Sequence, residues 1–409
     1  MIIRNNIPYK SSLNLLVISL HTCPLSPLGT ESAGGMNVYI SRLSMALEKL
    51  GFSIDIITKK HRECTEDVVY LSKQTKVIHL SSIPLNINKN KLYKYLDQFE
   101  KSIMDFITTT NNDYDLIHSH YWLSGMVGVN LSKNLNINNI TTFHTLAEIK
   151  NKTAGQEKES LIRSNCEDSI IKNADKIVVS TKHEMNVLQN SYDLNSTKVE
   201  IIEPGVDLNL FKPQNKNDSK KLLGLNNEPV LLYVGRIDPI KGLSVLIEAM
   251  NLLNYKDRPK LLVIGDNNQS NPTMLNVLEI IERYELQEDV VFIGATEQPN
   301  LPLYYNAADI CVIPSHYESF GLVALEAMAC NTPVIGTKVP GLESIITDQI
   351  NGLLIIPNSP KILAEKIKLL ISDKNLSKLI SINGLKKSKE MTWDSTAEKM
   401  TYLYRSLIN

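Results

Sequence analysis

Short apolar runs alternate with amphipathic stretches along the whole chain. In the first half these runs are rich in Val, Ile and Leu, have the length of buried strands, and are mostly separated by helical patterns. Parallel sheets that are covered by helices on both faces produce this alternation. The strands predicted for the first half are Leu15–Leu20, Ser53–Thr58, Val77–Leu80, Leu116–His118, Ile140–Phe143, Lys176–Ser180 and Val199–Ile202.

The same pattern restarts in the second half of the chain. The strands predicted there are Val230–Val234, Leu261–Ile264, Val290–Ile293, Ile310–Ile313 and Pro333–Ile335. This second complete series of strands and helices predicts a second domain of the same kind, because one hydrophobic core does not usually organise so many elements. The fold class we predict is therefore α/β, with two doubly wound parallel-sheet domains.

The length of the chain agrees with two large domains. At 409 residues it exceeds what one hydrophobic core usually organises, given a guide of roughly 150 residues per domain. We place the first domain at residues 1–205 and the second at residues 206–390. The polar stretch Gln214–Lys221 shows no periodicity and is predicted to connect them. Residues 391–409 contain a last helical pattern, Trp393–Leu407.

Charge and composition exclude several classes of partner. The formal net charge is −1, and the 43 basic and 44 acidic side chains are dispersed along the chain. Such a chain lacks the long-range field that binding to nucleic acid or to an anionic membrane surface requires. We therefore expect small-molecule partners, without nucleic acid, and leave open whether the chain forms a homodimer.

Five cysteines indicate a reducing environment. Their number is odd and they form no Cys-x-x-Cys pair, which argues against a zinc site and against a complete disulfide framework. The apolar run Leu15–Leu20 has about the length of a signal-peptide core, but no small-x-small cleavage site follows it, so we interpret it as a buried strand. No apolar stretch approaches the ~20 residues of a membrane span. We expect a cytoplasmic protein.

A glycine-containing loop follows the first predicted strand. It reads Glu31-Ser-Ala-Gly-Gly-Met-Asn37 and leads into a predicted helix, Met36–Leu50, whose apolar residues share one face and which should end at Gly51. Gly34 and Gly35 would allow positive φ angles and let backbone amides approach a ligand, while the helix start adds partial positive charge. This loop therefore predicts a phosphate-binding site.

Two further motifs lie in the second half. Arg236 and Lys241 stand five residues apart directly after the first strand of the second domain, where open α/β folds bind ligands. Together they could neutralise a diphosphate. Residues 315–326 read Ser-His-Tyr-Glu-Ser-Phe-Gly-Leu-Val-Ala-Leu-Glu, with Glu318 and Glu326 on either side of Gly321. Carboxylates near backbone amides and a helix start suit a ligand rich in hydroxyl groups.

These motifs resemble the nucleotide-sugar site of the family 4 glycosyltransferases. The matching patterns are Gly-Arg-x-x-x-x-Lys-Gly from Gly235 and Pro-Ser-x-x-Glu-Ser-Phe-Gly-Leu-x-x-x-Glu-Ala from Pro314. The resemblance implies two Rossmann-like domains facing a cleft (the GT-B fold), a UDP-sugar donor, and retention of configuration. It also implies donor contacts from Ser319, Phe320 and Leu322 besides the residues already named. Glu326 would bind the ribose, Glu318 would lie near the donor sugar, and no cofactor or metal would be required.

The first domain resembles the inositol 3-phosphate glycosyltransferases within that family, and shares part of its pattern with sucrose-phosphate synthases. Three segments carry the likeness: 31–39, 114–125 and 144–151. By this resemblance the acceptor's phosphate would be bound by Lys89, Tyr121, Thr145 and Arg163. Asn37 would lie near the acceptor hydroxyls, and His144 beside the donor sugar. The reaction implied is transfer of N-acetylglucosamine to 1D-myo-inositol 3-phosphate, and the final helix would return to the first domain.

Other interpretations are open at this stage. Lys91 could replace Lys89 after a shift of two residues, Arg163 could be a surface arginine, and Tyr121 a core aromatic residue. His118 and His120 alternate, which suits a metal site only if the strand continues through His120, and otherwise indicates a polar strand end. For the whole chain, the alternatives are a sucrose-phosphate synthase-like enzyme, another family 4 glycosyltransferase that acts on a different phosphorylated acceptor, a catalytically silent sugar-nucleotide-binding protein, and a phosphorylase of similar architecture. The choice between glucose and N-acetylglucosamine as the transferred sugar is open as well.

Overall fold

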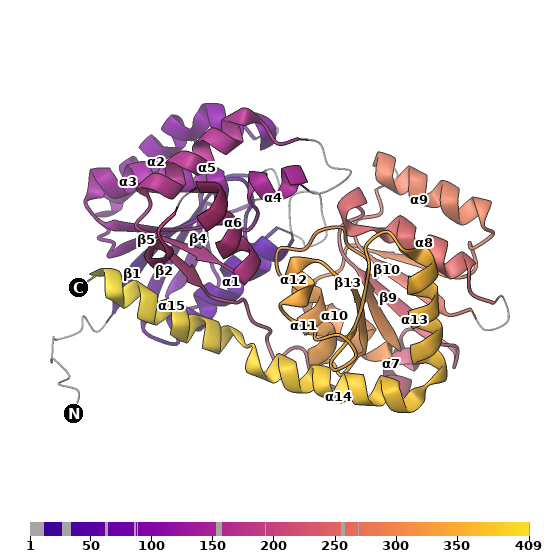
Figure 1. Cartoon of the computed structure of the whole chain (residues 1–409). Helices are drawn as coiled ribbons and strands as arrows, with labels where there is room; N and C mark the ends of the chain where they lie inside the picture. The colour runs from indigo at the N-terminus through magenta and orange to yellow at the C-terminus, as the bar shows by residue number, and fades with distance from the viewer. Residues whose placement is uncertain are drawn as a thin grey trace, which may run out of the picture.

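The computed structural model describes residues 12–26, 34–61, 64–85, 87, 89–152, 158–192, 194–254, 258–268 and 270–408. Two α/β domains lie side by side, each built on its own sheet (Figure 1). The prediction of two doubly wound parallel-sheet domains is confirmed. Within the described residues, no helix is long and apolar enough to cross a membrane.

The first domain contains a sheet of eight strands. In spatial order these are β3 (Val68–Tyr70), β4 (Thr75–Leu80), β2 (Phe52–Lys59), β1 (Leu13–Ile18), β5 (Leu116–His120), β6 (Asn138–Thr142), β7 (Lys176–Val179) and β8 (Val199–Ile201). All neighbours pair in parallel except β3, which is antiparallel to β4. The helices are α1 (Gly35–Glu48), α2 (Leu96–Thr110), α3 (Tyr121–Leu135), α4 (Ala147–Lys152), α5 (Leu161–Asn173) and α6 (Lys182–Tyr192), with 3₁₀ turns η1 (Lys89–Tyr95) and η2 (Ser196–Lys198).

The second domain contains a parallel sheet of six strands. Its spatial order is β11 (Val290–Gly294), β10 (Lys260–Ile264), β9 (Val230–Val234), β12 (Ile310–Ile313), β13 (Val334–Thr337) and β14 (Leu353–Ile355). The helices are α7 (Lys216–Leu222), α8 (Leu243–Asn251), α9 (Pro272–Arg283), α10 (Leu301–Ala307), α11 (Leu322–Ala329), α12 (Pro340–Glu343), α13 (Pro360–Ser372) and α14 (Lys374–Glu390), with 3₁₀ turns η3 (Pro239–Lys241) and η5 (Gln298–Asn300).

Alternation along the central strands explains why both faces of each sheet are covered. On β1, Leu16 and Ile18 belong to one buried cluster, while Leu15 and Val17 belong to the cluster on the opposite face. The central strand β9 divides its side chains between two clusters in the same way. Because successive strand residues point to opposite faces, a continuous apolar run can be buried only between two layers of helices.

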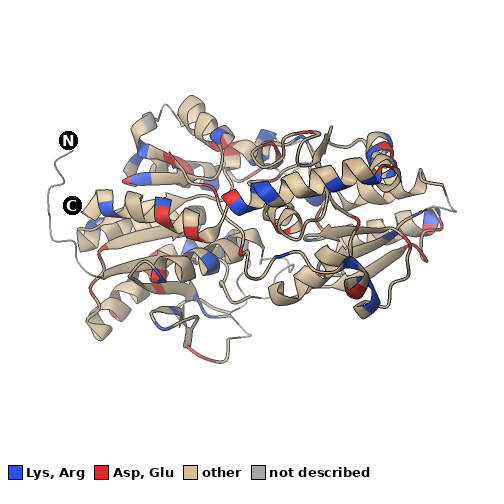
Figure 2. Cartoon of the chain, turned by 90° about the horizontal axis from the view of Figure 1, so that it is seen from below, with Lys and Arg blue, Asp and Glu red and all other residues tan. Residues whose placement is uncertain are grey.

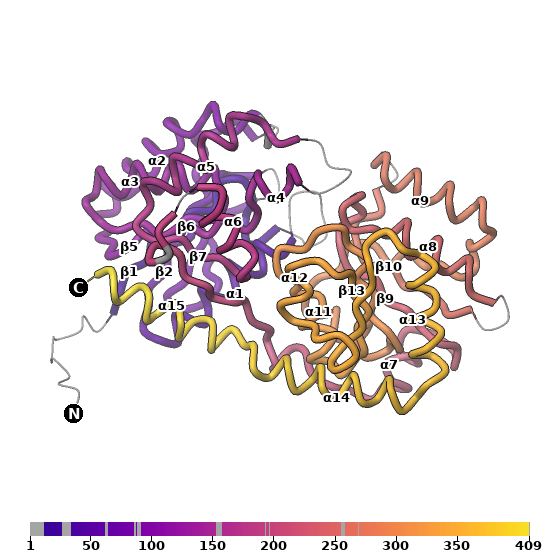
Figure 3. The backbone as a smooth tube through the Cα atoms, viewed as in Figure 1, coloured from indigo at the N-terminus to yellow at the C-terminus, as the bar shows by residue number. Residues whose placement is uncertain are grey.

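The chain crosses between the domains twice, at one place. Val206 and Thr392 form an isolated parallel bridge, and the Val206 amide donates to the Met391 carbonyl at 2.9 Å. Beyond this crossing, α15 (Trp393–Ile408) runs back along the first domain and packs on α1 (Figure 3). A Cβ atom on Gly205 would overlap the Thr392 backbone, so glycine lets the two crossings touch.

The polar stretch Gln214–Lys221 was predicted to connect the domains, and this was wrong. Most of it forms α7, which packs on α10 inside the second domain. Its polarity has a local cause, because Lys216 and Lys220 both pair with Asp309, at 3.0 and 2.8 Å. The predicted strands are present within one to two residues at most ends, whereas the three-residue strands β3 and β14 were not predicted. Basic and acidic side chains are scattered over both domains (Figure 2).

Candidate active site

A cavity of about 420 Å³ lies between the domains, at the carboxyl ends of the parallel strands. This is where open α/β sheets bind ligands, because the loops that follow the strands and the helix starts gather there. The first domain contributes the residues after β1, β5 and β6 and the start of α1. The second domain contributes the residues after β9 and β12 and the start of α11.

The loop after β9 places Arg236 and Lys241 on the cavity wall. Asp238 caps η3 by accepting a hydrogen bond from the Ile240 amide at 3.0 Å. Gly242 ends this turn with φ of 67°, and a Cβ atom there would overlap the Pro314 carbonyl oxygen. Both observations require glycine at this position, since other residues adopt this conformation only with strain.

Each of these two cations faces a carboxylate. The Lys241 Nζ lies 2.6 Å from Glu318 Oε1, which also accepts from the Ser315 hydroxyl at 2.8 Å. Arg236 makes a longer contact, 3.5 Å, with Asp238, and 38% of its side chain is exposed. These partners hold the cations near the cavity without burying them, so an anion that enters can compete for both.

The helix α11 points its start at the cavity. Gly321 precedes it with φ of 106°, and a Cβ atom there would approach Leu342 Cδ2 to 2.7 Å. Gly35 of the first domain lies opposite, since its own Cβ would lie 3.6 Å from Leu322 Cδ1. The starts of α1 and α11, from different domains, therefore meet at the cavity and both present backbone amides to it.

Glu326 is buried one turn further along α11. It accepts hydrogen bonds from the Tyr305 hydroxyl at 2.8 Å and from Gln298 Nε2 at 3.3 Å. Burial raises the pKa of this carboxyl to about 7, although both hydrogen bonds and the charge of Arg42 lower it. Arg42 of α1 donates to Gln298 Oε1 at 2.7 and 3.0 Å and pairs with Asp207 at 2.9 Å. A polar chain thus joins the first domain to Glu326.

The glycine loop before α1 differs from its prediction in one respect. Neither Gly34 nor Gly35 has a positive φ, so the expectation of a left-handed conformation there was wrong. Gly34 instead leaves open space, because no atom lies within 4 Å of an added Cβ. Asn37 holds the loop: its side chain accepts from the Gly34 amide at 3.1 Å and donates to Thr22 Oγ1 and the Cys23 carbonyl. Asn37 is therefore a structural anchor that also lines the cavity.

Three histidines form a row beside the cavity, in which His118 and His120 are buried and His144 lines the cavity. The strand β5 does continue through His120, so His118 and His120 share a face. His118 bonds to Tyr404 of α15 and to Thr142, and His120 Nδ1 lies 2.9 Å from His144 Nε2. Burial lowers the pKa of His118 and of His144 to about 3, so the imidazoles are neutral. Within the described part of the chain, no group of three or more His, Cys, Asp or Glu side chains could hold a metal ion.

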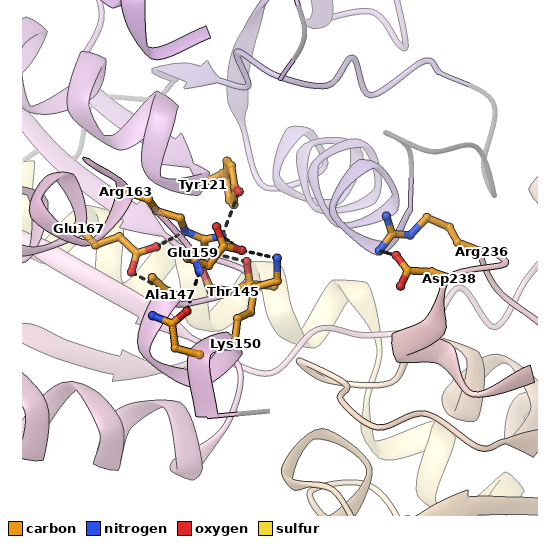
Figure 4. A network of polar contacts seen from close by, with 10 residues as sticks. Tyr121, Thr145, Ala147, Lys150, Glu159, Arg163, Glu167, Arg236 and Asp238 are labelled. Carbon is orange, nitrogen blue, oxygen red and sulfur yellow. Dashed lines mark hydrogen bonds and ion pairs between the residues drawn. The ribbon is translucent and has the colours of Figure 1, made fainter. Parts of the chain in front are cut away.

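A cluster around Arg163 lies on the opposite side of the cavity from Arg236 (Figure 4). Arg163 comes from α5 and is 1% exposed. Its Nε donates to Glu167 at 2.7 Å, and one terminal nitrogen donates to the Thr145 carbonyl and hydroxyl at 2.7 and 3.1 Å. The other terminal nitrogen donates to the Tyr121 hydroxyl at 3.1 Å and pairs with Glu159 at 3.0 Å. We call Tyr121, Thr145, Lys150, Glu159, Arg163 and Glu167 the Arg163 cluster.

Two protein-family descriptions match the chain. "Glycosyltransferase Family 4" covers residues 33–210, and "Glycosyl transferases group 1" covers residues 214–387. The D-inositol 3-phosphate glycosyltransferases of Corynebacterium diphtheriae and Corynebacterium urealyticum are 34% and 35% identical to it. These alignments cover 96% and 97% of this chain and 94% and 96% of the relatives. The chain belongs to the family 4 glycosyltransferases.

Solved structures agree with this family and its GT-B fold. Sucrose-phosphate synthase from Thermosynechococcus elongatus superposes with a TM-score of 0.90 at 33% identity, covering 97% of this chain and 99% of that one. Anabaena HepE in complex with UDP-glucose gives a TM-score of 0.77, covering 97% of this chain and 100% of that one; at 19% identity it shows the fold alone. The expectation of a GT-B glycosyltransferase enzyme is confirmed, against a silent binding protein or a phosphorylase.

The structure brings together most of the residues that the sequence singled out in this glycosyltransferase. The predicted residues that line the cavity are Gly34, Gly35, Asn37, Tyr121, His144, Thr145, Arg236, Lys241, Glu318, Ser319, Phe320, Gly321, Leu322 and Glu326. Arg163 lies behind Tyr121 and Thr145, and it is not the surface arginine considered as its alternative. The side chain of Lys89 lies outside the described residues. Which of these residues bind substrate stays a prediction.

Sequence reasoning missed several residues of the site. Lys150 lines the cavity, Glu159 and Glu167 pair with Arg163, and Arg42 reaches Gln298 of the other domain. The spacing of Glu159, Arg163 and Glu167, four residues apart each time, could have indicated ion pairs on one helix face. The expectation of metal independence also took Asp-x-Asp to be absent from the sequence, and this was wrong, since Asp113 and Asp115 form such a pair. It precedes β5 and contacts Asn14.

Proposed function

We propose that this glycosyltransferase transfers a sugar from a UDP-sugar to a phosphorylated polyol or sugar. Our first candidate reaction is transfer of N-acetylglucosamine from UDP-N-acetylglucosamine to 1D-myo-inositol 3-phosphate, with retention of configuration. The names of the 34–35% identical relatives support an inositol 3-phosphate acceptor. The observation that carries the proposal is the placement of two groups of cations, Arg236 with Lys241 and Lys150 with Arg163, on the two sides of one cavity.

The donor side supplies charge for the bond-breaking step. As the glycosidic bond of the donor weakens, negative charge grows on the leaving diphosphate and positive charge grows on the sugar ring. Fixed cations aimed at that diphosphate lower the barrier. Arg236 and Lys241 take this role, and the backbone amides at the start of α11 add partial positive charge. Glu326 accepts hydrogen bonds from the ribose, and Glu318 and His144 lie against the donor sugar.

The acceptor side supplies orientation. A phosphomonoester carries two negative charges and several acceptor oxygens, which suit a cluster of two cations and two hydroxyl groups. Tyr121 and Thr145 present hydroxyl groups that are already ordered by Arg163. Binding the phosphate there would hold the acceptor so that one of its hydroxyl groups faces the donor sugar across the cavity. Such orientation is one of the larger contributions that an enzyme makes to rate.

A sucrose-phosphate synthase-like reaction is the second candidate. The TM-score of 0.90 and 33% identity to the Thermosynechococcus enzyme favour it about as much as the curated relatives favour the first. Both names contain a phosphorylated compound, so both candidates use the same phosphate-binding cluster. Cytoplasmic location and independence from metal ions also belong to our expectations, and whether the chain forms a homodimer stays open; solution experiments will test each of them.

A matrix of substrates tests the proposal. The purified chain is incubated with UDP-N-acetylglucosamine or UDP-glucose, each against inositol 3-phosphate, fructose 6-phosphate and unphosphorylated inositol, and products are identified by mass spectrometry. We expect transfer to a phosphorylated acceptor with kcat/KM at least about 100-fold above that for inositol, since each charge-assisted hydrogen bond contributes about 1.5–3 kcal/mol. Equal use of inositol and inositol 3-phosphate would contradict the acceptor assignment. No transfer from either nucleotide sugar would contradict the donor assignment.

A further inference from the structure

The guanidinium of Arg163 has all of its donors engaged. An arginine has five N–H groups, and here they meet five acceptors: Glu167, the Tyr121 hydroxyl, the Thr145 carbonyl, the Thr145 hydroxyl and Glu159. A phosphate can therefore bond to Arg163 only if one of these partners leaves. The proposed function does not say which of these five acceptors gives way to the phosphate.

Exposure and connectivity single out Glu159. Glu167 is 0% exposed and also holds the start of α4 through the Ala147 amide at 2.9 Å. Tyr121 belongs to the buried core, and both Thr145 acceptors belong to the residue that leads into α4. Glu159 is 21% exposed and precedes the first turn of α5, where Ser160 is the cap. Rotation of its side chain alone would release Arg163.

Glu159 also neutralises a second cation, Lys150, at 2.5 Å from its Nζ. Figure 4 shows the carboxylate between Lys150 and the guanidinium. Burial raises the pKa of Glu159, but the charges of Arg163 and Lys150 outweigh burial and lower it overall, so this carboxyl is ionised. One oxygen of Glu159 thus contacts both cations, at 2.5 Å from Lys150 and 3.0 Å from Arg163.

The charges of the Arg163 cluster favour displacement of the Glu159 carboxylate when a phosphate binds. Counted as ions, Arg163 and Lys150 balance Glu167 and Glu159, so the four groups sum to zero. Burial raises the pKa of the Glu167 carboxyl, although the charge of Arg163 lowers it. A phosphate dianion would bring two further negative charges to this half-buried set, beside a carboxylate. Of the phosphate ligands expected from the sequence, only Lys89 would add a cation, so an excess of negative charge would remain, which is unfavourable. If Glu159 turns out into solvent, the phosphate meets two cations and a single remaining carboxylate.

We propose that Glu159 is an internal competitor for the acceptor's phosphate: it occupies Lys150 and Arg163 until the phosphate displaces it, and Lys150 then becomes a direct phosphate ligand. This inference rests on the proposed function, since it assumes a phosphorylated acceptor. Its consequence is selectivity. Only an anion with more charge than a carboxylate displaces Glu159 from Lys150 and Arg163. A neutral polyol cannot do so and therefore does not gain access to these two cations.

Glu159 could instead hold Arg163 in position for the phosphate. That role predicts the opposite change in phosphate affinity when Glu159 is replaced. We would titrate inorganic phosphate into the full chain by calorimetry, with saturating UDP present to fill the donor side. Competition predicts that Glu159→Gln tightens phosphate binding about tenfold, which corresponds to about 1.4 kcal/mol. Positioning predicts that the same change weakens binding. Glu159→Ala, which removes the hydrogen-bonding group as well, should tighten binding too. Unchanged or weaker binding in both variants would overturn the inference.

Matched controls separate this effect from a general change of charge. Glu148 and Lys152 of α4 pair with each other at 2.7 Å, close in sequence to the cluster, and neither lines the cavity. Glu148→Gln should leave the phosphate affinity at the wild-type value. Lys150→Met should weaken phosphate binding about tenfold, while Lys152→Met should not. An equal effect of Lys150→Met and Lys152→Met would remove Lys150 from the site.

Kinetics distinguish this inference from the proposed function. With the phosphorylated acceptor that the wild type uses, Glu159→Gln should lower KM and leave kcat nearly unchanged, because Glu159 competes with binding and not with chemistry. If the wild type uses a phosphorylated acceptor but KM is unchanged in Glu159→Gln, only the competitor role fails. If no variant binds phosphate and the wild type prefers unphosphorylated acceptors, the proposed acceptor class fails as well.

Discussion

On the second-domain wall of the cavity, Arg236 and Lys241 come from one turn after a single strand, and their side chains are 38% and 22% exposed. On the first-domain wall, Arg163 is almost fully buried. It bonds to Tyr121 of α3 and to Glu159 before α5, and Glu159 also pairs with Lys150 of α4. All of these cations are paired with carboxylates, but Arg236 and Lys241 stay partly exposed at the cavity, whereas the pair of Arg163 with Glu167 is fully buried. Their removal should therefore have different consequences.

The largest effect is expected at Arg163. Arg163→Met leaves Glu167, which is fully buried, without its cation, and breaking a buried pair in this way usually destabilises by about 3–5 kcal/mol. Urea unfolding measures this loss. Arg236→Met, at an exposed pair of 3.5 Å, is the matched control and should change stability by less than about 1 kcal/mol. Similar losses of unfolding free energy in the two variants would contradict the difference between a buried and an exposed wall.

The next effect concerns catalysis at the second-domain wall. Lys241→Ala should lower kcat by about 100-fold, as expected when a preorganised charge that stabilises the transition state is lost. Binding of UDP, measured by calorimetry, should weaken much less, because the charge matters most when the bond breaks. Lys361→Ala, an exposed lysine of α13, is the control. Near-normal turnover of Lys241→Ala would contradict the role of this cation.

The glycines of the two walls should respond differently to a methyl group. Gly242→Ala imposes a strained φ and an overlap with Pro314, and should destabilise the protein by about 1–3 kcal/mol. Gly34→Ala meets no atom within 4 Å and should fold with wild-type stability, while the methyl group enters the cavity and raises KM. Thermal unfolding and donor kinetics test the pair. Loss of stability in Gly34→Ala would show that this loop also depends on glycine.

Glu326 should link stability to pH. Its pKa is about 7 in the folded chain, above the ordinary value of 4.5, so the folded state holds this proton more tightly than the unfolded state. Wild-type stability should therefore fall as pH rises from about 4.5 to 7, by at most about 1.4 kcal/mol per pH unit from this group. Glu326→Gln removes this titrating group. The free energy of unfolding of the variant minus that of the wild type should therefore increase from about pH 4.5 to pH 7 and stay constant above it. A constant difference across the window would contradict the raised pKa.

The smallest effect is expected from chelation. If the cations of Arg236 and Lys241 neutralise the leaving diphosphate, EDTA should leave initial rates nearly unchanged. Added magnesium can still alter rates by binding free nucleotide. Complete loss of activity in EDTA, restored by one metal ion and not by others, would show that Arg236 and Lys241 need a metal ion beside them to neutralise the diphosphate.

The two walls also differ in how much of them the sequence could predict. Arg236 and Lys241, and likewise Glu318 and Glu326, belong to short contiguous motifs, so their neighbourhood follows from one strand and one helix start. The Arg163 cluster joins residues up to 46 positions apart, from Tyr121 to Glu167, and its ion pairs depend on how α4 and α5 pack. The same reason explains the error at Gln214–Lys221: two of its three lysines, Lys216 and Lys220, pair with Asp309, which lies far along the chain.

The double crossing at Gly205 and Thr392 makes the second domain an insertion within the first. The first domain's β1 precedes it in the chain and α15 follows it, and the two junctions are hydrogen-bonded to each other at Val206 and Met391. Residues 206 to 391 therefore form a cassette whose entry and exit lie at one point. A donor domain from another member of the family could be grafted as one piece, provided that glycine is kept at position 205 to let the junctions touch.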